Sequence, residues 1–202
     1  MTDTRLQHNH TMAFLDSFES LKRIKDAVVM DSGCGDGFAA HIFTTLGAKL
    51  VLAYDPVLSY NPEYEHQHIK WYDSLKYINR ICNICWSHHV IEHIDNPVEY
   101  LRQLKNHVAS SGEVWLSCPN TEHDAAFSLG HIHNFTIGNL VACFGKAGYG
   151  IRGIKWLVTP GQLRVRVPVC GSDDWPDPFI LKLKNSQHFN VHELPREWRW
   201  KQ

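Results

Sequence analysis

The sequence has no surplus of charge of either sign. Its 202 residues include 20 Lys and Arg against 21 Asp and Glu, which leaves a formal net charge of −1. Without a basic surplus, no long-range field draws the protein to nucleic acid or to an anionic membrane surface. We therefore expect no membrane partner, disfavour nucleic acid as a partner, and expect binding to depend on a local site.

Long apolar runs are also missing. The first residues, MTDTRLQHNHTMAF, are polar and lack the apolar centre of a signal peptide, and no later run is long enough to span a bilayer. These two absences predict a cytoplasmic protein. With 44% hydrophobic residues, a chain of this length is expected to fold as one globular domain over residues 1–202.

Cysteine is sparse and scattered, with six residues in the chain. Cys82 and Cys85 have the spacing of a metal-binding pair, but no second pair accompanies them and both lie in an apolar, strand-like run. Reduced thiols in the core are the favoured interpretation, and zinc binding is the alternative.

Repeats, low-complexity tracts and Gly/Ser linkers are absent, and the apolar residues switch repeatedly between helical and strand-like spacing. This alternation is typical of a parallel sheet flanked by helices. Helices are expected within residues 14–24, 38–46, 96–108 and 139–147. Strands are expected at residues 27–30, 50–54, 68–72, 81–86, 113–117, 151–158, 163–167 and 179–184.

The most informative segment is an apolar strand that ends in the glycine-rich turn DSGCGDG, residues 31–37, and opens a helix. Glycines allow positive φ angles and a close approach of a ligand to the main chain. Asp55 follows at the tip of the next predicted strand, where a carboxylate can accept hydrogen bonds from both hydroxyls of an adenosine ribose. These features predict a nucleoside site. The alternative is a turn that is structural or serves another ligand.

Charge indicates which nucleoside cofactor the turn suits. A dinucleotide places its diphosphate at the helix N-terminus, where Asp31 and Asp36 would repel it. S-adenosylmethionine has no phosphate, and it carries an ammonium and a sulfonium that carboxylates favour. We therefore expect S-adenosylmethionine as the cofactor and S-adenosylhomocysteine as its product.

Five motifs in order along the chain resemble those of the class I S-adenosylmethionine-dependent methyltransferases. They are DSGCGDG (31–37), AYDP (53–56), Asp73-Ser74, SHHVIEHIDNP (87–97) and SGEVWLSCPN (111–120). The likeness covers about residues 25–150 and is greatest to the small-molecule, methyltransferase 11/23-like type, whose members include ubiquinone-pathway O-methyltransferases. It implies an α/β, Rossmann-like three-layer sandwich with a mostly parallel seven-stranded sheet whose last strand is antiparallel.

The resemblance also implies where the cofactor is held. The residues expected to bind it are Asp31, Gly33, Cys34, Gly35, Asp55, Pro56, Asp73, Ser74, Ser87 and His88. By the resemblance, the glycine turn holds the methionine end, Asp55 the ribose and Asp73 the adenine amino group. Two positions depart from the family pattern: Ser32 stands where a small apolar residue is usual, and Asn83 where an aspartate often begins the fourth strand.

Fourteen histidines supply candidates for chemistry near neutral pH. A base is needed only if the methyl acceptor is a protonated hydroxyl or amine, and His93 and His133 are the candidates. If the segment after the fourth strand is helical, His89, Glu92 and His93 share one face, and the loop after the fifth strand adds His131 and His133.

Three hypotheses for this histidine cluster stay open. The first is a hydrogen-bonded network that fixes the helix and the loop, and the second is a base or acceptor-binding role for His93 or His133. The third is a divalent metal ion held by His89, Glu92, His93 and His133. The network is the favoured interpretation, so we expect no metal cofactor.

Two other patterns concern charged residues near the end of the chain. Arg164 and Arg166 alternate with apolar residues, which predicts a strand with one face in solvent, while contact with an anionic acceptor is the alternative. Residues 196–201, REWRWK, are expected to pack on the domain rather than stack on nucleic acid.

The sequence thus predicts a methyltransferase that acts on an oxygen or nitrogen atom of a small-molecule acceptor. Residues 1–25 and 120–202 are expected to form the acceptor side, which a second subunit of a homodimer could complete. A cofactor-binding scaffold without activity and an RNA methyltransferase are the alternatives. The Asn/Asp-Pro-Pro-aromatic motif of nucleic-acid methyltransferases is absent after the fourth strand, where His88-His-Val stands instead.

Overall fold

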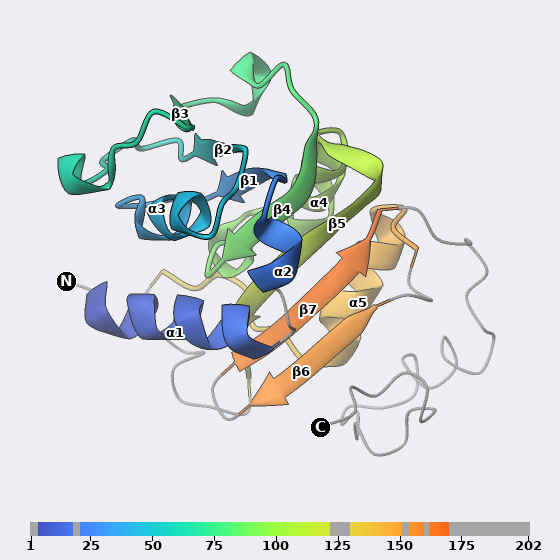
Figure 1. Ribbon diagram of the computed structural model, residues 1–202. Helices are drawn as coiled ribbons and strands as arrows, with labels where there is room; N and C mark the ends of the chain where they lie inside the picture. The colour runs from blue at the N-terminus through green and yellow to red at the C-terminus, as the bar shows by residue number, and fades with distance from the viewer. Residues whose placement is uncertain (1–3, 18–20, 122–129, 151–153, 160–161, 170–202) are drawn as a thin grey trace.

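The computed structural model describes residues 4–17, 21–121, 130–150, 154–159 and 162–169 (Figure 1). Within these ranges the chain forms a seven-stranded sheet in the order β3-β2-β1-β4-β5-β7-β6. The strands are β1 (Val28–Ser32), β2 (Leu50–Tyr54), β3 (Ile69–Tyr72), β4 (Cys82–His88), β5 (Val108–Pro119), β6 (Lys155–Thr159) and β7 (Gln162–Pro168). The α-helices are α1 (Thr4–Ser17), α2 (Leu21–Ile24), α3 (Phe38–Thr45), α4 (Pro97–Lys105) and α5 (Ile137–Lys146). Short 3-10 turns are η1 (Pro62–Tyr64), η2 (Leu75–Tyr77) and η3 (Ile91–His93).

The direction of the strands confirms the predicted fold class. Strands β1 to β5 pair in parallel, and β7 pairs antiparallel with both β5 and β6. The fold is therefore a Rossmann-like α/β sandwich with a mostly parallel sheet. Because β1, β2 and β4 are neighbours and run the same way, the loops that follow them meet at one edge of the sheet.

Helices cover both faces of the sheet, which gives the molecule three layers (Figure 1). Side chains of successive residues in a strand point to opposite faces, so Val29 and Met30 of β1 belong to different core clusters. Met30 packs in the cluster that includes helices α4 and α5, and Val29 packs in the cluster that includes α1, α2 and α3. In the described part of the chain, no helix combines the length and the apolar character needed to cross a bilayer.

Capping residues fix where helices α4 and α5 begin. Asn96 accepts a hydrogen bond from the backbone N–H of Glu99, with Pro97 in the first turn of α4, as the sequence predicts. Thr136 and Asn139 form a reciprocal capping box at the start of α5. Cys82 and Cys85 are buried, unpaired thiols in β4, in agreement with the core interpretation.

Several element boundaries differ from prediction. The expected helix over residues 14–24 is two helices, of which α1 starts at Thr4. Strand β5 starts at Val108, within the segment expected to be helical, and its register with β4 shifts between Cys82 and Ile84. Gly112 allows this bulge, because a Cβ atom there would lie 2.6 Å from the carbonyl oxygen of Asn83. The strand predicted at 179–184 and the tail at 196–201 lie outside the described residues.

The prediction that Arg164 and Arg166 face solvent is wrong. Their exposed fractions are only 7% and 3%, because β7 lies inside the sheet and helices of the α1 to α3 layer cover this face. Arg164 donates from Nη1 to the carbonyl oxygen of Ala13 in α1, at 3.0 Å. An alternating pattern of charged and apolar residues is the same whether solvent or a helix covers the charged side.

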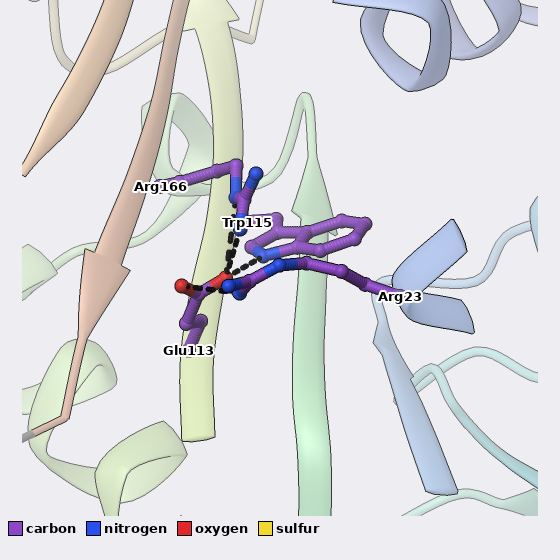
Figure 2. A network of polar contacts seen from close by, with 4 residues as sticks. All are labelled: Arg23, Glu113, Trp115 and Arg166. Atoms are coloured by element: carbon purple, nitrogen blue, oxygen red, sulfur yellow. Dashed lines mark hydrogen bonds and ion pairs between the residues drawn. The ribbon is translucent and has the colours of Figure 1, made fainter. Parts of the chain in front are cut away.

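Glu113 is the centre of a polar network on this face (Figure 2). Its Oε2 accepts hydrogen bonds from Nη2 of Arg166 at 2.5 Å and from Nε1 of Trp115 at 2.8 Å. Its Oε1 lies 2.6 Å from Nη1 of Arg23 in α2. Burial alone would raise the pKa of Glu113, but the hydrogen bonds from Arg166 and Trp115 and the two nearby guanidinium groups lower it. The network therefore joins α2, β5 and β7.

We predict that Glu113 and Arg23 contribute very differently to stability. Glu113→Ala leaves the guanidinium of Arg166 buried without its partner and should lower the free energy of unfolding by about 3 kcal/mol. Arg23→Ala removes a half-exposed partner and should cost less than about 1 kcal/mol. Denaturant titration of both variants measures the difference, and equal losses would show that the network is not organised around Arg166.

Candidate functional site

The turn between β1 and α3 forms one wall of the site. The N–H groups of Gly33 and Cys34 both donate to the carbonyl oxygen of Tyr54, at 2.7 and 3.0 Å, which ties the turn to the end of β2. Gly33 has a φ of 83°, and a Cβ atom there would lie 2.2 Å from Cγ2 of Val90. The position requires glycine for both reasons. The main chain is thereby brought close to the loop that follows β4.

A cavity of about 740 Å³ opens at this edge of the sheet. The sequence-predicted cofactor residues that line it are Asp31, Gly33, Cys34, Gly35, Asp55, Pro56 and His88. His89 and His93 also line it, as do residues that sequence reasoning did not single out: Thr11 of α1, Val90, and Glu99 and Tyr100 of α4. A cavity of this size at the carboxyl ends of parallel strands suits a ligand the size of a nucleoside cofactor.

Three predicted residues lie elsewhere. Asp73 is exposed at the end of β3, outside this cavity. Ser74 lines a smaller neighbouring hollow, which Leu75 links to the main cavity because it lines both. Ser87 is fully buried and does not line the cavity, but its Oγ lies 2.9 Å from the hydroxyl of Tyr100, which does.

Asp31 has the most unusual environment of the site. The side chain is buried, and one carboxylate oxygen, Oδ2, has no hydrogen-bond partner among the described residues. Burial, reinforced by the nearby charge of Asp55, raises the pKa of Asp31 from 3.8 to about 8. A buried acceptor that lines a cavity and has no partner can be satisfied by a donor group of a ligand, and most strongly by a cationic one.

Asp55, in contrast to Asp31, has a hydrogen-bond partner for each of its carboxylate oxygens. Its Oδ2 accepts from the N–H of Gly35 at 3.1 Å, and its Oδ1 accepts from the N–H of Val57 at 2.9 Å. Each carboxylate oxygen can accept two hydrogen bonds, so both remain able to accept from a ligand hydroxyl. These backbone contacts fix the orientation of the carboxylate beside the glycine turn.

Tyr100 links the two strands that end at the cavity. Its hydroxyl lies 2.9 Å from Oγ of Ser32 in β1 and 2.9 Å from Oγ of Ser87 in β4, and all three groups are buried. The unusual Ser32 is therefore a partner of Tyr100. Asn83, the other departure, accepts through its side chain from the N–H of Val28 at 2.8 Å and ties the start of β1 to β4. Tyr100 gave no sequence signal beyond a place in the helix after Asn96-Pro97.

His88 faces the cavity as a neutral imidazole. Both ring nitrogens are buried and have no hydrogen-bond partner among the described residues. Burial, with smaller contributions from His89, His10 and Arg164, lowers the pKa of His88 well below 6.5. The ring stacks on Trp86 of β4, with 5.4 Å between the ring centroids.

The segment after β4 is not the helix that the histidine spacing assumed. His89 adopts a left-handed conformation with φ of 54°, and residues Ile91–His93 form a single 3-10 turn. The backbone N–H groups of Ile132 and His133 both donate to the carbonyl oxygen of Glu92 at 2.9 and 3.1 Å, so the loop after β5 lies against this turn.

This arrangement brings together a different set of residues from the one expected. One ligand atom each of Glu92, His93 and His131 lie within 4.8 Å of one another, the group of this kind found in the described part of the chain. His133 instead contacts the carbonyl oxygen of Asp95 through Nε2 at 3.2 Å. His89 lies beside the group, with Nδ1 at 3.2 Å from Oε1 of Glu92.

Comparisons with known proteins agree with the fold. A family model described as a methyltransferase domain matches residues 6–152. A search of curated protein sequences gives no significant match.

Three solved structures illustrate the likeness in fold. The 1,6-didemethyltoxoflavin-N1-methyltransferase of Burkholderia thailandensis, with 1,6-didemethyltoxoflavin and S-adenosylhomocysteine bound, has a TM-score of 0.60 at 15% identity, over 82% of this chain and 79% of that one. The magnesium protoporphyrin IX methyltransferase of Synechocystis PCC 6803, with S-adenosylhomocysteine bound, has a TM-score of 0.58 at 13% identity, over 79% and 82%. An S-adenosylmethionine-dependent methyltransferase of Mesorhizobium loti has a TM-score of 0.56 at 13% identity, over 76% and 99%.

The family model covers well over half of the chain, and the sheet order and strand directions agree with the fold that its motifs imply. The chain belongs to the methyltransferase-domain family and is a class I S-adenosylmethionine-dependent methyltransferase.

Proposed function

We propose that this protein transfers the methyl group of S-adenosylmethionine to an oxygen or nitrogen atom of a small-molecule acceptor bound in the 740 Å³ cavity. The cavity has room for a nucleoside cofactor and a small acceptor, and it is lined by Thr11 of α1 as well as by the strand ends. The names of the Burkholderia and Synechocystis enzymes give small molecules as their acceptors, which supports this class of acceptor here.

The observation that carries the proposal is the unpaired oxygen of Asp31. A buried carboxylate beside a second one, Asp55, is stabilised by a cation and destabilised by a phosphate. The ammonium of the methionine end of S-adenosylmethionine supplies that cation. We assign Asp31 and the main chain of Gly33, Cys34 and Gly35 to the methionine end.

The other cofactor contacts follow the strand tips. Asp55 accepts from the two ribose hydroxyls with the lone pairs that its backbone contacts leave open. Pro56 lies against the same part of the cofactor, and Asp73 and Ser74 meet the adenine at the end of β3. Ser87 acts through Tyr100 rather than by direct contact.

Methyl transfer depends mainly on the alignment of the acceptor with the cofactor. S-adenosylmethionine supplies a methyl group on a positively charged sulfur, which is already a good leaving group. The residues of the chain must hold acceptor and cofactor in line, an effect that can contribute about 7–11 kcal/mol. His88, neutral and without a partner, can accept a hydrogen bond from the acceptor, and His93 at the rim is the candidate base for a protonated hydroxyl or amine. His133 holds the loop in place and is the weaker candidate base, because its Nε2 already contacts the carbonyl oxygen of Asp95.

The proposal is tested by incubating the protein and radiolabelled S-adenosylmethionine with small phenols, amines and nucleosides, and in parallel with tRNA and a protein extract. We expect label in one of the small-molecule pools. Label in tRNA or protein alone would contradict the acceptor class. Cofactor binding without transfer to any pool would instead indicate a scaffold protein.

Replacing Asp31 should separate stability from binding. The raised pKa means that the folded state keeps a proton that the unfolded state loses, so the free energy of unfolding falls as pH rises from about 4 to about 8. Asp31→Asn removes this penalty, and at pH 8 it should stabilise the free protein by more than about 1.4 kcal/mol, the equivalent of one pKa unit. At pH 4, the free energy of unfolding of Asp31→Asn should equal that of the wild-type protein.

The same substitution should weaken binding of S-adenosylmethionine by more than about tenfold, as expected for the loss of a charge-assisted hydrogen bond. Calorimetric titration and thermal melts over this pH range measure the two effects. Unchanged affinity together with unchanged stability would remove Asp31 from the site.

Asp55→Ala should weaken cofactor binding by at least about tenfold, because two hydrogen bonds to a charged group are lost, each of roughly 1.5–3 kcal/mol. Glu63→Ala, which removes an exposed acid from the neighbouring η1 turn, is the matched control and should bind normally. If both variants bind alike, the ribose contact assigned to Asp55 is wrong.

A further inference from the structure

We propose that Glu92, His93 and His131 bind a divalent transition-metal ion of the zinc class at the rim of the methyl-transfer cavity. One nitrogen or oxygen atom of each residue lies within 4.8 Å of the others. Bound ligands of a tetrahedral zinc site stand about 3.3 Å apart, given metal–ligand bonds of 2.0–2.1 Å. The three atoms must therefore draw together by up to about 1.5 Å when an ion binds.

The carboxylate of Glu92 is the strongest indication of a bound cation. Its side chain is 1% exposed, and neither carboxylate oxygen has a hydrogen-bond partner among the described residues. His89 lies at ion-pair distance from Oε1, but without the geometry of a hydrogen bond. A buried carboxylate in this condition costs several kcal/mol unless a cation joins it.

The backbone holds the group together independently of any ion. The carbonyl oxygen of Glu92 accepts two N–H groups from the residues that follow His131, namely Ile132 and His133. His133 adds a second anchor through its contact with the carbonyl oxygen of Asp95. The loop that carries His131 is therefore fixed against the turn that carries Glu92 and His93, which lowers the cost of organising a metal site.

Neighbouring groups orient the ligands in the way that metal sites require. His93 lies 2.9 Å from the carbonyl oxygen of Gly130 through Nδ1, which must therefore carry the proton. Nε2 is left with its lone pair to bind a cation, in which case His93 is a metal ligand and not the base for the acceptor. His89, on the other side of Glu92, has Nδ1 at 3.2 Å from Oε1 without the geometry of a hydrogen bond, and its Nε2 faces the side-chain amide of Gln162 at 3.0 Å.

The donor set indicates the kind of ion. Two imidazoles and one carboxylate are the ligands of catalytic zinc sites, which keep a further position open, and of several iron(II) sites. Mg²⁺ and Ca²⁺ prefer oxygen ligands and are disfavoured. This set differs from the one that the sequence spacing suggested, since His131 takes the place of His133 and His89 becomes a neighbour of the site.

Of the three residues, His93 lines the cavity, so an ion held by this group would lie at the cavity rim. An acceptor hydroxyl or carboxylate bound to the ion would be held at the same rim. This consequence rests on the proposed function, whereas metal binding itself does not.

The test uses the full chain after treatment with EDTA and titration with Co²⁺, whose visible absorption reports coordination by nitrogen and oxygen. Zn²⁺ is then added as a competitor, with calorimetry for stoichiometry. We expect one ion per chain, displaced by Zn²⁺. Glu92→Gln and His131→Asn should each weaken Co²⁺ binding by at least about tenfold, the scale of losing a group that holds or orients a metal.

The chain offers a matched control in another pair of histidines. His66 and His68 lie with their ring centroids 5.3 Å apart on the far side of β2 from this group, and could bind an ion on their own. His66→Asn should leave Co²⁺ binding unchanged. Loss of binding in His66→Asn and retention in His131→Asn would overturn the proposal, as would the absence of binding to the wild-type protein at millimolar Co²⁺.

A parallel titration of the EDTA-treated protein with S-adenosylmethionine keeps the two proposals apart. Glu92 and His131 do not line the cavity, so cofactor binding should survive metal removal and both substitutions. Normal cofactor binding without Co²⁺ binding would reject the metal site alone. If the untreated wild-type protein does not bind S-adenosylmethionine, the proposed function is rejected instead. Circular dichroism of Glu92→Gln and His131→Asn shows whether a variant that fails to bind Co²⁺ is still folded.

Discussion

A carboxylate buried at the end of β1, with one oxygen left without a partner, is the constraint on which the site depends. Asp31 can be held there only because the parallel strands β1, β2 and β4 end together and because the glycine turn brings main-chain N–H groups rather than side chains to the same place. In the free protein, the pKa of about 8 shows that the charged form of the Asp31 carboxyl group is unfavourable where it is buried. A cationic ligand stabilises this charged form, which is how a site can be selective for a sulfonium nucleoside over a diphosphate.

The rest of the molecule keeps the strand ends in register. Tyr100 joins β1 to β4 through two buried serine hydroxyls, and Asn83 joins the other ends of the same strands. Glu113 and its partners connect β5, β7 and α2 on the face that α1 also covers. Polar groups that depart from the family pattern or from the predicted solvent face are therefore structural contacts between elements.

The sequence was sufficient to predict the elements that form the candidate cofactor site, and the reasons are local. An apolar run that ends in DSGCGDG, an acid at the tip of the next strand and the Asn96-Pro97 cap each depend on a few adjacent residues. What could not be predicted depends on packing between distant segments. Arg164 has the same pattern whether solvent or α1 covers it. His131 and His133 are two residues apart in a loop, and only the backbone contacts with Glu92 decide which of them faces that carboxylate.

We propose above that Asp31 binds the amino group of the cofactor. A crystal structure of the protein with S-adenosylhomocysteine tests it most directly. We expect the ligand's ammonium nitrogen to lie within about 3 Å of Oδ2 of Asp31, a normal length for a charge-assisted hydrogen bond, and the ribose hydroxyls to contact Asp55. A complex in which the ligand is bound and Oδ2 of Asp31 still has no partner would contradict it.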